Sequence, residues 1–157
     1  MDILTFAIKM ELDGETFYTE QAKINHENGL DIVFLMLAKD EKMHAQILQN
    51  KEHKLPYKLN DSELLSKAKN VFDNFDLNKQ IVNQLEVYRT ALKNEKDSIN
   101  LYQDYLAKAT DDESKSLFEY LIKEEEGHYS IIDQLISHIS RAEEWVESAE
   151  FGVREEY

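Results

Sequence analysis

The chain has 157 residues, the length of one domain, and its 18 basic and 32 acidic side chains give a formal net charge of −14 at pH 7. This charge argues against nucleic-acid binding, which requires a basic surface, and against docking on an anionic membrane. Cysteine is absent, which excludes disulfides, thiolate metal sites and cysteine nucleophiles within these residues. Only four glycines and one proline occur, so the composition favours long helices and an all-α fold.

The first half of the chain predicts an antiparallel helical hairpin. Apolar residues recur at helical spacing over residues 2–25 and again over residues 30–51, and Gly29 lies at the turn between them. The N-terminal segment has neither the basic start nor the apolar run of a signal peptide, and nowhere do 18 apolar residues follow one another. We therefore expect a cytoplasmic protein without a membrane span.

The second half predicts a matching hairpin. Helical segments cover residues 78–109 and 110–140, and the latter opens with the capping-box pattern Thr110-Asp111-Asp112-Glu113. The connection between the hairpins has about 27 residues, contains the only proline and includes a short helix that ends near Phe72, which suits a long crossover along a four-helix bundle. We expect a bundle domain over residues 1–140, followed by an acidic tail, residues 141–157, that packs Trp145.

The two hairpins are copies of one unit. When the sequence is aligned with itself at an offset of 84 residues, residues 7–48 match the second hairpin without a gap. Apolar positions such as Phe34 and Phe118 correspond, as a duplicated structural hairpin requires. The offset also pairs polar residues, which a purely structural repeat does not explain: Glu11 with Glu95, Glu41 with Glu125, and His44 with His128.

These six polar residues interrupt the apolar helix stripes at one level. Each long helix has one glutamate on its apolar stripe, and in the second and fourth a histidine follows three residues later, on the same face. At ~1.5 Å per residue, Glu11 and the pair Glu41 and His44 lie ~20–25 Å from their shared turn, and the second hairpin repeats this depth. All six side chains are expected in one layer inside the bundle, whereas Glu124 and Glu126, which flank Glu125, are expected to face solvent.

Four carboxylates in one buried layer repel one another and need cations. Two divalent ions would neutralise four glutamates with both histidines neutral, and such ligands suit iron or manganese, while zinc also binds them. Ferritin-like bundles hold two metal ions in this way, with a glutamate from each of two helices and Glu-x-x-His from each of the other two. A metal-free polar layer that specifies the helix register is the alternative.

The sequence resembles the rubrerythrin family from Leu4 to about Ser140. The resemblance rests on Met10-Glu11 with Phe17-Tyr18, on Asp40-Glu41-Lys42-Met43-His44, on Glu95 with Tyr102, and on Glu124-Glu125-Glu126-Gly127-His128. It implies a ferritin-like four-helix bundle that binds two iron ions, with manganese or zinc as substitutes. The implied metal ligands are Glu11, Glu41, His44, Glu95, Glu125 and His128.

The resemblance also singles out two tyrosines and two departures. Tyr18 and Tyr102 follow the glutamates of the first and third helices by seven residues, within about 20° of the same helix face. They resemble the family's hydrogen-bond donors to the carboxylates, with core packing as the alternative. Members of the family usually add a rubredoxin module with four cysteines, which are missing here. They often have an extra glutamate where this chain has Ser98, and Glu15 is either its replacement or a surface residue.

For function, the resemblance implies an enzyme that reduces hydrogen peroxide to water, with Tyr18 and Tyr102 as catalytic residues. The electrons would come from an external donor such as a rubredoxin-like protein, and the expected assembly is a homodimer. Two alternatives stay open. One is a ferritin-like ferroxidase that oxidises ferrous iron with oxygen and stores it, and the other is a non-catalytic metal-binding bundle.

Overall fold

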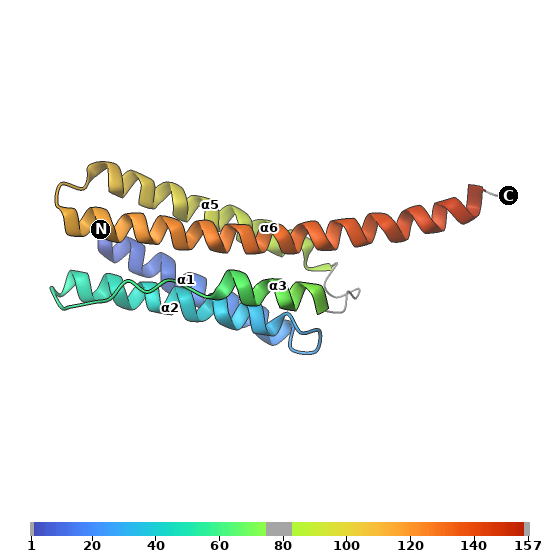
Figure 1. Cartoon of the computed structure of the whole chain (residues 1–157), viewed down its shortest axis with the longest axis horizontal. Coiled ribbons are helices and arrows are strands. Elements are labelled where there is room, and N and C mark those ends of the chain that lie inside the picture. Colours follow the sequence, from blue (N-terminus) through green and yellow to red (C-terminus); the bar gives the residue numbers. More distant parts are fainter. Residues whose placement is uncertain (1, 75–82, 156–157) are drawn as a thin grey trace.

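The structure is a computed structural model that describes residues 2–74 and 83–155, with side chains described up to residue 141. This part of the chain is all-helical, and α1 pairs with α2, and α5 with α6, in two antiparallel hairpins, whereas α3 lies against α2 and α6 (Figure 1). The predicted ferritin-like bundle is confirmed. No helix among the described residues has the length and apolar character needed to cross a membrane. The helices are α1 (Ile3–Ile24), α2 (Asp31–Glu52), α3 (Leu64–Asn74), α5 (Leu85–Lys108) and α6 (Asp112–Glu155).

Local side-chain and backbone signals set the helix ends. The Asp2 carboxylate accepts a hydrogen bond from the Leu4 backbone N–H at the start of α1. Gly29 has a φ of 88° in the turn before α2, a left-handed conformation that glycine adopts without strain. Ahead of α6, Asp111 Oδ2 accepts the Ser114 backbone N–H at 2.9 Å. Asp111 therefore caps this helix, whereas the predicted capping box would have used Thr110.

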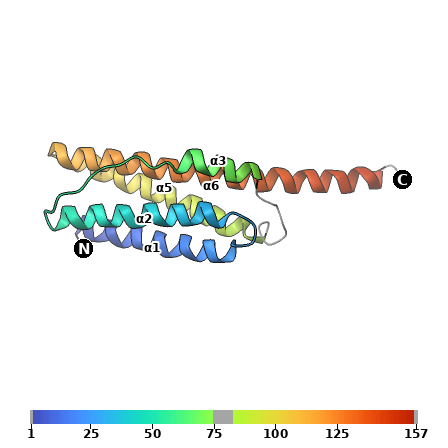
Figure 2. The same ribbon diagram turned by 60° about the horizontal axis from the view of Figure 1, so that its bottom comes forward.

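The connector after α2 runs back along the bundle, so α5 begins at the end where α2 begins (Figures 1 and 2). Ser62 Oγ, near the end of this connector, accepts the Leu64 backbone N–H at 3.2 Å and starts α3. The crossover with a short helix matches the expectation from the sequence. The expected start of the third long helix near residue 78 lies outside the described residues, because residues 75–82 are not among them.

Helix α6 is longer than the sequence predicted. It continues past Ser140 to Glu155 and extends beyond the other helices (Figures 1 and 2). The backbone of residues 141–155 is helical. This segment contains five glutamates, which favour a helix, and has no glycine or proline before Gly152. The predicted packing of Trp145 lies outside the described side chains.

Two apolar clusters fill the bundle and leave a polar layer between them. One cluster gathers Phe34 and Leu37 of α2 with Ile132 and Leu135 of α6, and α3 packs onto it through Leu64 and other apolar residues. The other cluster contains Ala7, Leu48, Tyr102 and Leu121. Both clusters draw residues from α1, α2, α5 and α6, at opposite ends of the bundle. Each buried leucine or phenylalanine contributes about 1.5–3 kcal/mol, so these clusters stabilise the helices that hold the polar layer.

Candidate metal centre

All six predicted ligands lie in this polar layer. Glu11 comes from α1, Glu41 and His44 from α2, Glu95 from α5, and Glu125 and His128 from α6. None of the six is more than 4% exposed to solvent. The structure thus brings together every residue that the sequence placed at this level, while their role as metal ligands stays a prediction.

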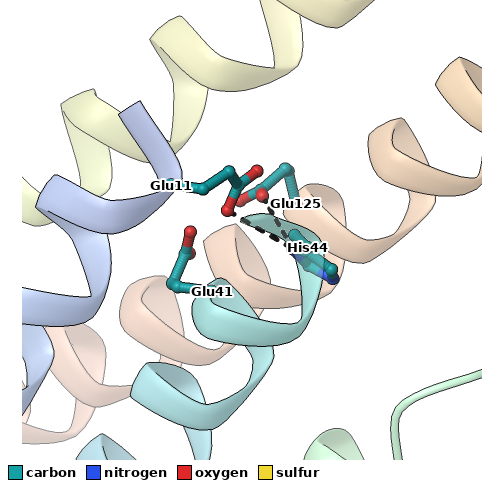
Figure 3. A group of neighbouring side chains, drawn as sticks. All are labelled: Glu11, Glu41, His44 and Glu125. Carbon is teal, nitrogen blue, oxygen red and sulfur yellow. Dashed lines mark ion pairs between the residues drawn. The ribbon is translucent and has the colours of Figure 1, made fainter. Parts of the chain in front are cut away.

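The six residues form two overlapping groups of four. Within each group, one potential ligand atom per residue lies within 4.8 Å of the others. Glu41 and Glu125 belong to both groups, so each would contribute to holding both ions if two were bound. Figure 3 shows the first group converging from α1, α2 and α6. The groups are Glu11, Glu41, His44 and Glu125, and Glu41, Glu95, Glu125 and His128.

Unpartnered buried atoms show that these residues fit bound cations. Five buried atoms of the predicted ligands lack a hydrogen-bond partner: Glu11 Oε2, Glu95 Oε2, both oxygens of Glu125 and His44 Nδ1. A buried polar atom without a partner costs about 1–3 kcal/mol, and more when it is charged. Two divalent cations would satisfy these atoms and balance the four carboxylates. Carboxylate and imidazole donors suit iron, manganese and zinc.

Both histidines are oriented by carboxylates that sequence reasoning missed. His128 donates Nε2–H to Asp40 Oδ2 at 3.0 Å, and His44 Nε2 lies 3.4 Å from Glu124 Oε1. Their Nδ1 atoms face the glutamates of the centre, and His128 Nδ1 lies 3.0 Å from Glu41 Oε1. Nδ1 is therefore the nitrogen available to a metal. Such outer carboxylates fix the tautomer and ring orientation of ligating histidines.

Glu124 is a correction to the sequence interpretation, which placed the residues flanking Glu125 in solvent. Glu124 is only 7% exposed, and of the two glutamates that flank Glu125 only Glu126 is exposed. A signal was present, since Asp40 and Glu124 are related by the same 84-residue offset as the ligands. Ser62 donates its hydroxyl to Asp40 at 2.7 Å, and the Tyr120 hydroxyl lies 3.1 Å from Glu124 Oε1.

Two tyrosines form hydrogen bonds that link one hairpin to the other. Tyr18 on α1 donates its hydroxyl to Glu95 on α5 at 2.5 Å, and Tyr102 on α5 donates to Glu11 on α1 at 2.6 Å. Burial raises the pKa of both tyrosines well above the usual range, and the nearby carboxylates raise it further. Both therefore stay neutral donors, which orient the two glutamates that belong to only one group each.

Without a bound cation the centre retains protons. Burial and the neighbouring glutamates raise the pKa of Glu41 and Glu125 well above the usual carboxyl range. Burial lowers the pKa of a histidine, but the ionised glutamates beside His44 and His128 raise it well above the usual value. Burial alone would also raise the pKa of Glu11, yet hydrogen bonding with Glu41 and the charge of His44 hold it at about 2. Cations must displace the retained protons, so metal affinity rises with pH.

Two small residues adjoin the centre. A Cβ atom at Gly14 would lie 3.0 Å from Glu41 Oε2, so glycine leaves room for this carboxylate in the middle of α1. Ser98, one turn after Glu95, is 8% exposed and brings a hydroxyl instead of a carboxylate. Glu15, the other carboxylate considered from the sequence, is half-buried and belongs to neither group of four.

Comparison with protein families identifies one match. The family model described as Rubrerythrin matches residues 2–136, which include the first hairpin, α3, α5 and the first part of α6. No curated protein and no solved structure matches the chain significantly. These 157 residues contain no cysteine, so no rubredoxin-type iron site lies within them. The chain belongs to the rubrerythrin family, and its bundle carries a buried glutamate and histidine site suited to two metal ions.

Proposed function

We propose that the protein is a di-iron enzyme that reduces hydrogen peroxide to water with electrons from an external donor. The observation that carries this proposal is the pair of four-residue groups that share Glu41 and Glu125 between two apolar clusters. Two ferrous ions held there would act as Lewis acids and supply the two electrons that, with two protons, convert one peroxide molecule to two water molecules.

The protein's contribution is to hold both ions close together and shield them from bulk water. Glu41 and Glu125 belong to both ligand groups, so both ions would be held in one site. The two electrons of the reaction would then come from that one site. Asp40 and Glu124 hold the Nε2–H groups of the histidines, which would leave the Nδ1 atoms available to bound ions.

Tyr18 and Tyr102 are proposed to keep the carboxylates of Glu95 and Glu11 in place while the charge of the centre changes during the reaction. Each donates one hydrogen bond to a glutamate on the opposite hairpin, so a shift of Glu95 or Glu11 is opposed from across the bundle. Because burial raises their pKa, both hydroxyls remain protonated at neutral pH.

The reductant is proposed to be a separate redox protein of the rubredoxin-like kind, and the assembly a homodimer. The chain has no cysteine for an iron–sulfur or thiol couple of its own. Spent electrons must therefore be replaced from outside these residues. Light scattering separates a homodimer from the large shell that an iron-storing protein would form.

The test is anaerobic reconstitution with ferrous iron, followed by iron analysis and peroxide addition. We expect two irons per chain and one peroxide consumed per two irons oxidised, with faster oxidation by peroxide than by oxygen. Glu125→Gln should abolish the reaction, whereas Glu126→Gln, on the exposed neighbour, should preserve it. Failure to bind iron, or equal turnover in Glu125→Gln, would refute the proposal. Iron uptake far beyond two per chain would support the ferroxidase alternative instead.

A further inference from the structure

A cleft between α1 and α5 leads from the surface to the centre. It encloses about 510 Å³ and reaches Glu41 and Glu95, together with the Tyr18 ring. Phe17 and Leu101 give it apolar walls. The cleft is not lined by Glu11, His44, Glu125 or His128. It therefore reaches the centre on the side of Glu95, one of the two glutamates that belong to a single group of four.

Small residues keep the inner end of the cleft open. Gly14 and Ser98 face it from the two helices and are related by the 84-residue repeat. A side chain on Gly14 would press on Glu41. Ser98 Oγ lies 3.4 Å from Met10 Sδ and 3.1 Å from the Asn94 carbonyl oxygen. The hydroxyl has one proton and the Asn94 carbonyl is a stronger acceptor than the thioether, so the lone pairs of Ser98 Oγ are available to a ligand that donates a hydrogen bond.

The charge around the cleft selects against anions. Four acidic side chains line it: Asp13, Asp97, Glu41 and Glu95. Lys9 is its one basic lining residue, and its ammonium group is paired with Asp13 at 2.9 Å. A small neutral molecule that both donates and accepts hydrogen bonds suits these surroundings.

We propose that this cleft is the binding site for hydrogen peroxide, with Ser98 Oγ as the acceptor of a hydrogen bond from peroxide and Met10 as a thioether that peroxide can oxidise. The proposal rests on the proposed function for the identity of the ligand. It makes Ser98 a positioning residue and directs peroxide to the side of Glu41 and Glu95. In the side reaction, peroxide transfers one oxygen to Met10 Sδ. The O–O bond breaks, the sulfur becomes a sulfoxide, and water leaves.

A second cavity on the other side of the centre supplies controls. It encloses about 480 Å³ between α6 and the end of the connector, and it reaches His128 and Glu124. Ser130 lines this cavity and not the first. If peroxide used this route, changes at the α1–α5 cleft would have no effect.

The first test follows methionine oxidation in the full chain with zinc, which has no redox chemistry of its own. Mass spectrometry would follow sulfoxide formation at Met10 against two internal standards, the half-buried Met36 and Met43. We expect Met10 to react several-fold faster. Asn94→Trp, at the exposed rim of the cleft, should slow it at least fivefold, whereas Asn100→Trp, on the exposed surface of α5 away from the cleft, should not. Equal rates at the three methionines, or no effect of Asn94→Trp, would overturn the proposal.

The second test separates binding from chemistry in the iron-loaded chain. Ser98→Ala should raise KM for peroxide about three- to tenfold with kcat unchanged, the loss of one hydrogen bond. Ser130→Ala should leave both unchanged, and an unchanged KM in Ser98→Ala refutes the role of Ser98. The methionine assay needs no iron. Selective Met10 oxidation without iron-dependent turnover would therefore reject the peroxidase function alone, and turnover without Met10 selectivity would reject the cleft alone.

Discussion

The two overlapping ligand groups predict how many bound metal ions are weakened when a given glutamate is replaced. Glu95 belongs to one group and Glu125 to both. Glu95→Gln should therefore leave one group of four intact and reduce the bound metal from two ions to one. Glu125→Gln removes a carboxylate from both groups and should weaken both ions. Glutamine has nearly the same shape as glutamate, so neither change creates a cavity.

The size of the effect follows from the type of contact that is lost. Removing an outer partner of a ligating histidine costs about 10- to 100-fold in metal affinity, so losing a direct carboxylate ligand should cost more than about 100-fold. The metal-free fold should tolerate Glu125→Gln, because the raised pKa of Glu125 favours its neutral form, which glutamine imitates. Glu11→Gln should destabilise the metal-free chain, because Glu11 is ionised and paired there.

Native mass spectrometry and competition with a chromophoric chelator measure these stoichiometries directly. Zinc or cobalt titration of the wild type should show two tight ions per chain. The exposed Glu126→Gln variant should match it and controls for the loss of one negative charge from α6. The shared-carboxylate geometry is wrong if Glu125→Gln retains one ion at full affinity, or if Glu95→Gln loses both.

Three further predictions follow from the same centre. The metal-free chain should be most stable in mild acid and lose stability as the pH rises through neutrality. The two shared glutamates and both histidines have folded pKa values raised above the unfolded ones, so their contribution is complete below the unfolded pKa and is lost as the pH rises through the folded pKa. Metal affinity should rise over the same range, and thermal melts with and without zinc from pH 5 to about 9 check both trends. Asp40→Asn should weaken metal binding about 10- to 100-fold, whereas the exposed Asp133→Asn should have no effect; a null result for Asp40 would remove its orienting role. Gly14→Ala should lower metal affinity by pressing on Glu41, although alanine favours a helix interior by about 1 kcal/mol over glycine; a gain in stability with full metal affinity would contradict this.

The sequence predicted the depth of the site because depth depends on helical rise alone. Glu11 and Glu41 are 30 residues apart around one turn, and regular helices with a short turn must bring them to the same level. The hairpins, the crossover and the six-residue layer follow from such counting. The end of α6 did not follow, because the acidic composition beyond Ser140 indicates a tail, whereas the backbone continues as a helix to Glu155.

The sequence did not predict which residues of different helices contact one another across the bundle. Whether a glutamate is shared or terminal depends on distances between helices, which periodicity does not contain. The same holds for the crossed pairing of Tyr18 with Glu95 and for the contact of Glu124 with His44. Glu124 was misjudged because its helical position, next to a core ligand, is usually exposed. Only the repeat, which aligns it with Asp40, distinguishes it from Glu126.

Duplication gives the centre a symmetric ligand set, but the rest of the fold does not preserve the symmetry. The connector occurs once, and through Ser62 it contacts Asp40, the partner of His128. The corresponding carboxylate, Glu124, contacts Tyr120 of its own helix instead. The α1–α5 cleft likewise touches Glu95 and not Glu11. Two ions held by identical ligand types would therefore differ in hydrogen bonding and in access. Since the ligands alone are equivalent, any difference in reactivity between the two ions must arise from these surroundings.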